Sequence, residues 1–441
     1  MEDVVSHFTS RKLITALVVV LAIAPGLFAE DAPKTIALRA ARLIDGTGSA
    51  PVADAVILVT GNRITAAGAA SRVAIPEGVE VIDLGDATLL PGLFDSHVHL
   101  LGRTLQDPKM MDSSARDVDS LGAILGVPHA EATLMAGFTS VRNVGAADFS
   151  DIALKQAIDE GLIPGPRILP AGHALGITGG HCDDNGWKPG LLDGNVRTGI
   201  ANGSDEVRAA VRYQVKYGAG VIKACATGGV LSEGDAVGAT QYTMEEMRAM
   251  VQEAAKLERK VAAHAHGAEG IRIAVEAGVA SIEHGSFLDE EGARMMKDRG
   301  TWLVPTLYAG EAVEQAAESG ILTGFRAEKA TLAAAAMRKA IRLAVKTGVP
   351  IAFGTDAGVI PHGSNAHEFE LLVEWGGLAP MDAIVSATGN AAKLFGWDDR
   401  LGTLAPGKLA DVIAVSGNPL ENISRMREVT FVMKDGTIYR K

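Results

Sequence analysis

The stretch GLFDSHVH, residues 92–99, is the part of the sequence from which the fold can be worked out. Its apolar run ends on two histidines, His97 and His99, separated by one residue. Strand side chains alternate with a period of two, so both imidazoles would lie on one face and could bind one metal ion together. Such pairs also occur near turns in proteins without metals, so the rest of the chain has to decide between the two interpretations.

Seven further apolar runs of the same kind follow, and helical patterns lie between several of them. The runs are GFTSVRNVG (137–145), RILPAG (167–172), GVIKACATGG (220–229), KVAAHAHG (260–267), ASIEHGS (280–286), TWLVPTL (301–307) and PIAFGTDAG (350–358). Segments such as TMEEMRAMVQEAAKLER (243–259) have the apolar spacing of an amphipathic helix. Strand–helix alternation repeated about eight times predicts an α/β fold, a (β/α)8 TIM barrel over residues 91–403.

The two ends of the chain have a different pattern. Residues 35–90 consist of short alternating runs divided by Gly, Asn and Asp, and the C-terminus carries similar runs around a KDG turn. We therefore expect a small β-sandwich domain built from both termini, from residues 30–90 and 404–441.

Polar residues gather where the predicted barrel strands end. They are His97, His99, Lys223, His264, His266, His284 and Asp356. Active-site residues of such barrels lie at the carboxyl ends of the strands. Histidine and carboxylate side chains in this number suit Zn²⁺ and related divalent ions, so a metal site is predicted at this end of the barrel.

Lys223 is the unusual member of this set, because its run is otherwise apolar. A buried lysine has a lowered pKa and can be neutral and nucleophilic. A neutral amine can add CO2 to give a carbamate, whose two oxygens could bridge two cations. A structural lysine paired with an acid is the alternative.

Taken together, these residues resemble the metal-dependent amidohydrolase superfamily. TLLPGLFDSHVH (88–99) resembles its entry motif, and LGTLAPGKLADVIAVSGNPL (401–420) resembles the segment that returns to the small domain. The resemblance implies two Zn²⁺ ions, one held by His97, His99 and Asp356 and the other by His264 and His284. Carboxylated Lys223 and a hydroxide would bridge them. Asp356 would take the proton of the attacking hydroxide and pass it to the leaving amine.

Within the superfamily, GITGGHCD (176–183), AAHAHG and SIEHGSF resemble the prolidase-like Xaa-dipeptidase branch and the ochratoxin-hydrolysing amidohydrolases. This implies release of a C-terminal amino acid from Xaa-Pro or Xaa-basic dipeptides or N-acyl amino acids, including ochratoxin A cleaved to ochratoxin alpha and L-phenylalanine. His181 and Arg142 are candidates for the substrate carboxylate, although a strand-end Arg is also typical of a structural ion pair. His181, Tyr242 or His266 could donate to the oxyanion, and His266 could instead support the ligands.

Two other functions are weighed against this one. A cyclic-amide hydrolase of the imidazolonepropionase or dihydropyrimidinase type uses the same fold, but Lys223 disfavours the imidazolonepropionases, which typically lack a carboxylated lysine. A non-catalytic scaffold would have lost ligands, and here the whole set is present.

Composition and the N-terminus bear on partners and location. A net charge of −12 argues against nucleic acid as the main partner. Residues 1–29 resemble a signal peptide, with Arg11 and Lys12 before an apolar run; an uncleaved membrane anchor is the alternative. We expect an exported enzyme, periplasmic or secreted, with no membrane contact once the signal is removed. The resemblance also implies a homo-oligomer.

Cys182 and Cys225 are the only cysteines in the sequence. Two cysteines cannot make a disulfide framework, and there is no CxxC pair for zinc. A single disulfide between them is open, but Cys225 lies in an apolar run and is expected to be a buried thiol.

Overall fold

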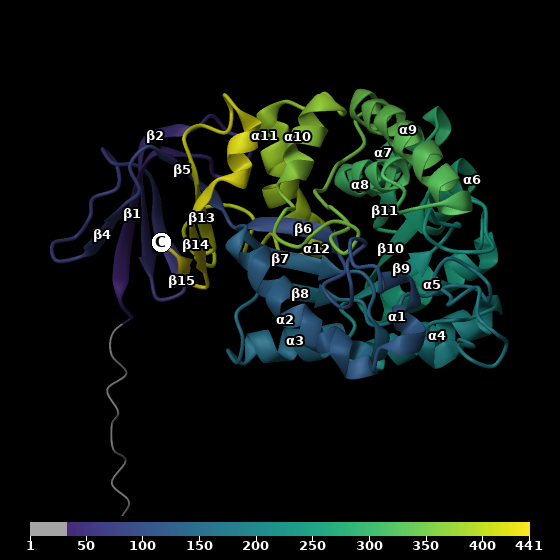
Figure 1. Ribbon diagram of the computed structural model, residues 1–441. Coiled ribbons are helices and arrows are strands. Elements are labelled where there is room, and N and C mark those ends of the chain that lie inside the picture. Colours follow the sequence, from purple (N-terminus) through teal and green to yellow (C-terminus); the bar gives the residue numbers. More distant parts are fainter. Residues whose placement is uncertain (1–32) are drawn as a thin grey trace, which may run out of the picture. The chain divides into compact units, whose positions relative to one another are not determined.

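Strands from the two ends of the chain form one sheet in the computed structural model, which describes residues 33–441 (Figure 1). The sheet runs in the order β15-β14-β13-β5-β1-β2-β3, with β4 paired to β1. Its strands are β1 (Thr35–Leu43), β2 (Val52–Thr60), β3 (Arg63–Ala69), β4 (Glu80–Asp83), β5 (Ala87–Pro91), β13 (Val412–Ser416), β14 (Val429–Lys434) and β15 (Thr437–Arg440). The two ends meet where β5 pairs antiparallel with β13. Both ends of the chain thus contribute strands to one sheet, whereas the sequence predicts a β-sandwich; the domain bounds of 30–90 and 404–441 stay a prediction, and the proposed signal peptide lies outside the described residues.

Two further sheets carry the barrel strands, and every pair in them is parallel. They are β6 (Leu93–Val98), β7 (Phe138–Asn143) and β8 (Arg167–Pro170) in one, and β9 (Val221–Cys225), β10 (Lys260–Ala265), β11 (Ser281–His284) and β12 (Trp302–Val304) in the other. Gly92, just before β6, has to be glycine because a Cβ there would lie 2.1 Å from Thr139 Oγ1 on β7. The opening motif therefore carries a packing requirement as well as its histidines.

Backbone hydrogen bonds join the two sheets into a ring. Residues 350–357 supply the eighth strand, since Ala352 N donates to Leu303 O at 3.0 Å on one side and Asp356 N donates to His97 O at 2.8 Å on the other. At the second junction, Gly220 N donates to Pro170 O at 2.8 Å. All eight apolar runs of the sequence thus lie in the ring, and the predicted TIM barrel with an additional domain is confirmed.

Helices lie around the outside of these strands (Figure 1). They are α1 (Ser113–Arg116), α2 (Asp119–Met135), α3 (Ser150–Asp159), α4 (Gly203–Lys216), α5 (Met244–Lys256), α6 (Ala268–Ala277), α7 (Glu290–Arg299), α8 (Leu307–Glu318), α9 (Gly324–Thr347), α10 (His367–Glu374), α11 (Pro380–Val385) and α12 (Ala391–Phe395). Helix α5 shows why these segments are helical. Thr243 and Glu246 form a capping box at its start, and its buried residues include Met247, Met250 and Ala254 on one face. No helix in this part of the chain is long and apolar enough to cross a bilayer.

The β domain and the barrel are held together by buried charges. Arg167, the first residue of β8, donates to Asp411 of the β domain at 3.1 Å and also contacts Asp435. Lys434, at the end of β14, is 7% exposed and donates to Gly165 O at 2.6 Å. Every charge of this junction thus has a partner within the described residues.

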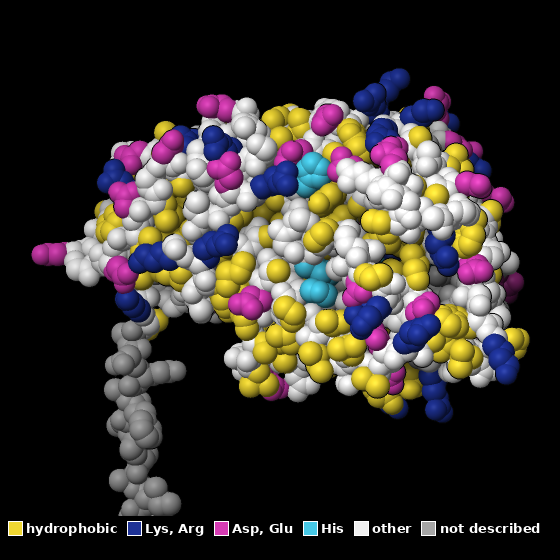
Figure 2. Space-filling view, in the orientation of Figure 1, with side chains coloured by type: hydrophobic (Ala, Val, Ile, Leu, Met, Phe, Trp, Pro, Cys, Tyr) yellow, Lys and Arg dark blue, Asp and Glu magenta, His cyan; other side chains and the backbone are white. Residues whose placement is uncertain are grey.

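Charges at the surface are mixed. On the face shown in Figure 2, Lys and Arg side chains are interspersed with Asp and Glu side chains. A nucleic-acid site would need a continuous basic area, and that face has none. This agrees with the net charge of −12.

Candidate active site

The carboxyl ends of the barrel strands open into a cavity of about 500 Å³. The six residues predicted as metal ligands all line it: His97, His99, Lys223, His264, His284 and Asp356. They come from five different strands of the ring, so only the folded barrel brings them together. The structure therefore assembles the set that the strand ends predict.

The first group of potential ligands consists of His97, His99 and Asp356. Their nearest ligand atoms all lie within 4.8 Å of one another. The Nε2 atoms of His97 and His99 are each 3.5 Å from Asp356 Oδ1, and Lys223 Nζ is 3.5 Å from His97 Nε2. These distances are at the limit of a hydrogen bond, so the atoms surround a common point without bonding firmly to one another.

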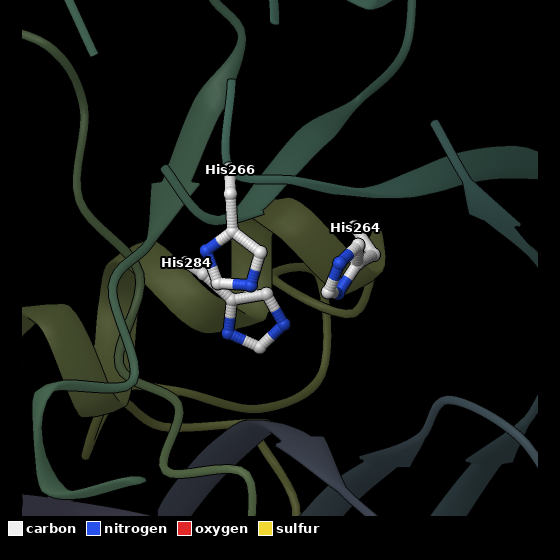
Figure 3. A group of neighbouring side chains, drawn as sticks. All are labelled: His264, His266 and His284. Atoms are coloured by element: carbon white, nitrogen blue, oxygen red, sulfur yellow. The ribbon is translucent and has the colours of Figure 1, made fainter. Parts of the chain in front are cut away.

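The second group consists of His264, His266 and His284, whose rings face one another (Figure 3). The Nδ1 of His266 is 2.6 Å from Ser286 Oγ, and the Nδ1 of His284 is 2.7 Å from Thr306 Oγ1. The rings of His266 and His284 are thus held through Nδ1 and leave Nε2 for a ligand, whereas His264 Nε2 is 3.4 Å from Gly228 O. His266, which the sequence leaves open between two roles, lies with the potential ligands.

The two groups adjoin, because the ring centroids of His97 and His284 are 4.9 Å apart. Burial is the main electrostatic influence on both. It lowers the pKa of His99 to about 4 and that of His266 to about 3, and it lowers the pKa of Lys223 to about 8. The imidazoles are therefore neutral at pH 7 and offer lone pairs, as metal ligands must.

A buried carboxylate stands behind His97. Glu283 Oε2 accepts from His97 Nδ1 at 2.8 Å, which turns His97 Nε2 toward the cavity. Arg142 donates to Glu283 Oε1 at 2.8 Å and to Ser96 O at 2.7 Å. Arg142 is 1% exposed and does not line the cavity. Of the two roles considered for it, the structure therefore favours the structural ion pair over a substrate contact.

Tyr242 and His181, the other candidates for substrate contact, differ in position. Tyr242 is 1% exposed and does not line the cavity, so it is not positioned to contact a substrate directly. His181 lines the cavity and stacks on His264, with ring centroids 4.1 Å apart. Burial lowers the pKa of His181 to about 4, so at neutral pH it brings no positive charge to a substrate carboxylate.

The hydrogen bonds of His181 fix its tautomer. Ser232 Oγ lies 2.8 Å from Asp235 Oδ1 and 3.0 Å from His181 Nδ1. Because a carboxylate only accepts, the serine proton goes to Asp235, and His181 Nδ1–H donates to the serine oxygen. His181 therefore presents an unprotonated Nε2, which is an acceptor for a substrate N–H.

The prediction that Cys225 is an unpaired thiol is wrong. Cys225, on β9, is joined to Cys182, with a Cα–Cα distance of 5.9 Å. The loop after β8 folds back along β9, where Leu175 N donates to Lys223 O at 2.8 Å, and this return brings the two cysteines together. The apolar surroundings of Cys225 gave no signal of a partner 43 residues away.

Two of the potential ligands occupy an unusual backbone conformation. His284 has φ = 70° and Asp356 has φ = 60°, and both residues end their strands. Non-glycine residues at positive φ are uncommon, and the strain is of order 1 kcal/mol or more per residue. Such strain is found mainly at functional sites.

Apolar side chains form much of the remaining wall. They include Met110, Met111, Val230, Leu231, Val313 and Met337. Val313 and Met337 lie on α8 and α9, and nothing in their helical patterns marks them as part of a site. His362 and His367 do not line the cavity; His362 stacks on His129, and His367 contacts Glu311 at 2.9 Å.

Comparison with known proteins agrees with this geometry. The amidohydrolase family profile matches residues 88–439. The chain is 37% identical to ochratoxinase of Aspergillus niger over 432 residues, covering 93% of this chain and 88% of the relative. It is also similar to the crystal structure of a Xaa-Pro dipeptidase with bound methionine in its active site (TM-score 0.88, 41% identity, 92% and 100% of the two chains), and to that of a prolidase complexed with N-methylphosphonate-L-proline (TM-score 0.84, 32% identity, 92% and 100%).

Proposed function

The chain belongs to the amidohydrolase family, and from this premise we propose that it is a binuclear zinc hydrolase that removes the C-terminal amino acid from dipeptides or N-acyl amino acids. Hydrolysis of amide or peptide bonds follows from the family and from the likeness to ochratoxinase and Xaa-Pro dipeptidase. The observation that carries the finer proposal is the pair of adjoining ligand groups with Lys223 beside them.

The residues present fit two zinc ions. His97, His99 and Asp356 would hold one ion, and His264 and His284 the other, with the Nε2 of His266 also within reach. Lys223, whose lowered pKa makes the neutral amine accessible, would add CO2 with release of a proton, and the resulting carbamate would be a further ligand for the metal ions. When bound, the metals supply a water of lowered pKa and polarise the carbonyl group.

Asp356 is the residue that would move the proton. Burial raises its pKa to about 6, so the carboxyl group holds a proton more readily than an exposed aspartate does. Its Oδ1 is 3.5 Å from both His97 Nε2 and His99 Nε2, so it would be close to a water held by a metal ion at these ligands. It would accept the proton of that water and donate it to the leaving nitrogen as the amide bond breaks.

The substrate classes follow from the relatives and the cavity. The relatives are named for ochratoxin and for Xaa-Pro dipeptides, and the similar dipeptidase structure holds methionine in its active site. Apolar walls formed by Met337, Val313 and Leu231 suit an apolar side chain or an aromatic acyl group. We include ochratoxin A, cleaved to ochratoxin alpha and L-phenylalanine, among the proposed substrates.

One experiment tests the proposal. Purified protein loaded with zinc and bicarbonate is assayed with Met-Pro, Met-Arg, N-benzoyl-L-phenylalanine and ochratoxin A, and its zinc content is measured. We expect about two zinc ions per chain and turnover of at least one of these amides. Asp356→Asn should lower kcat by about 10²- to 10⁴-fold. Zinc well below one per chain, or turnover of cyclic amides alone, would contradict the proposal.

We also propose that the enzyme is exported and assembles as a homo-oligomer. The bond between Cys182 and Cys225 supports export, since disulfides persist in oxidising compartments. Cell fractionation and size-exclusion chromatography would test the two statements separately.

A further inference from the structure

Cations that line the cavity are few, and they differ in what they already bind. Within the described part of the chain they are Lys223, Arg103 and Arg326. Lys223 stands among the metal ligands. A substrate with a free C-terminal carboxylate needs a charged donor elsewhere in the cavity, and the two arginines are the candidates.

Arg103 is already neutralised. Its Nε and Nη2 donate to Asp117 at 2.7 and 3.0 Å, and its Nη1 donates to Asp107 at 2.7 Å. Two carboxylates thus surround one guanidinium, so the group has a local net negative charge. A substrate carboxylate would be repelled there and would have to displace a bidentate pair.

Arg326 has donors to spare. Its Nε donates to Leu231 O at 2.9 Å, and its Nη2 is 3.4 Å from Glu233 Oε2, a long and weak contact to a half-exposed partner. The guanidinium lies over the ring of Phe325, 4.7 Å from its centroid, a contact that uses no N–H group. Of the five N–H donors of an arginine, most are therefore available to a ligand.

The position of Arg326 in its helix adds to this. It is the third residue of α9, a 24-residue helix. A positive side chain in the first turn opposes the helix dipole, whose positive end favours anions. The charge of Arg326 therefore lowers the stability of α9. It also lies where it would attract an anion bound in the cavity.

We propose that Arg326 binds the carboxylate of the departing amino acid, with Glu233 as the side chain that this carboxylate displaces. The inference rests on the proposed function and names its substrate as an amide with a free carboxylate beside the scissile bond. The Nε bond to Leu231 O holds the guanidinium in place, while Nη1 and Nη2 remain for a two-pronged contact.

The test compares matched substrates that differ only in charge. Values of kcat/KM are measured for Met-Pro and N-benzoyl-L-phenylalanine and for the C-terminal primary amide of each. Arg326→Met should lower kcat/KM for the two carboxylates by about 10- to 100-fold, the effect of losing a charge-assisted bond, and leave the two amides within about threefold. Arg326→Lys should recover part of the loss. Glu233→Gln should lower KM for the carboxylates only.

Arg103→Met is the control. It removes a cation from the same cavity, so it should affect carboxylates and amides equally. The inference would be overturned if Arg326→Met lowered kcat/KM equally for carboxylates and amides. It would also be overturned if Arg103→Met, and not Arg326→Met, abolished the preference for carboxylates. If the wild type cleaves no substrate, the proposed function fails on its own. Calorimetric binding of L-methionine and L-methioninamide to zinc-loaded wild type and Arg326→Met then decides the inference: only L-methionine should weaken, and equal affinities would overturn it.

Discussion

The two ends of the barrel strands both carry charged and polar groups, but the distances from these groups to their partners differ. At the amino ends, Arg167 is bonded to Asp411, and Lys260 Nζ donates to Leu394 O at 2.7 Å. At the carboxyl ends, the contacts of His97 Nε2 with Lys223 and Asp356 are 3.5 Å long. Buried polar groups normally have close partners, so the carboxyl ends have the arrangement of a site built for a ligand, and the amino ends that of a structural joint.

The difference predicts which property each region controls. Groups whose partners lie within the protein contribute to the free energy of unfolding, and breaking a buried pair leaves an uncompensated charge. Groups that converge on the cavity contribute to binding and catalysis, and they lower the stability of the fold. Substitutions in each region therefore test whether it controls stability or catalysis.

Lys223→Met should give the largest effect. We expect kcat/KM to fall by about 10³-fold or more, because the bridging ligand and much of the charge stabilisation it supports are lost. In the metal-free protein, where Lys223 is not carboxylated, the melting temperature should stay the same or rise, since a desolvated amine is removed from the interior. Lys260→Met, on β10 but at the opposite end, is the control and should keep its kcat/KM. A strong loss of activity in Lys260→Met would contradict the purely structural role of the amino ends.

Arg167→Met should have the reverse profile. Asp411, 4% exposed, would lose its charged partner, and we expect a loss of about 3–5 kcal/mol in the free energy of unfolding. Urea denaturation measures this, and kcat/KM for the best substrate should remain unchanged. A kinetic defect without a stability defect would mean that the joint between the domains takes part in the site.

Cys182→Ser combined with Cys225→Ser tests the loop beside the site. The bond closes a separation of 43 residues, for which a loss of about 2–4 kcal/mol is typical. A reducing agent should lower the melting temperature of the wild type by as much as the double substitution does, and it should leave the melting temperature of the double variant unchanged. A wild type that does not respond to the reductant would contradict the pairing.

Glu283→Gln should give the smallest effect on the site itself, and it lies between the two classes because it also leaves the buried Arg142 without its charged partner. Glu283 is fully buried and bonds both His97 Nδ1 and Arg142. A carboxylate behind a ligating histidine typically contributes about 10- to 100-fold in metal affinity. Zinc affinity of the apoprotein, measured by competition with a chromophoric chelator, should fall by that factor. Glu314→Gln, which alters the pair with Arg338 away from the cavity, should leave zinc affinity unchanged.

Much of the fold was predictable because its signals are local. Each barrel strand is a short apolar run that ends in a polar residue, and the i, i+2 spacing of His97 and His99 is enough to place both on one face. The same holds for His264 on β10 and His284 on β11, which end comparable runs. Period and run length therefore predicted the architecture and the polar residues at the strand ends, and the family resemblance selected the six ligand candidates among them.

The remainder depends on tertiary packing. Arg142 follows the same pattern as the ligands, and only its contact with Glu283 shows that it faces away from the cavity. Arg326 lies in an ordinary helical pattern, and only the fold brings α9 to the cavity. Cys182 meets Cys225 because a loop turns back along β9, and sequence spacing does not reveal such a return.

The positive φ values of His284 and Asp356 have a consequence for redesign. Histidine, aspartate and asparagine are the non-glycine residues that best tolerate the left-handed conformation. Histidine and aspartate are also common metal ligands, so backbone geometry and coordination chemistry select from the same short list at these two positions. Exchanging either for glutamate, glutamine or cysteine to alter metal preference would meet a conformational obstacle before any question of ligand affinity. Changes of metal preference should therefore be easier to engineer through His97 or His264, which do not carry a positive φ.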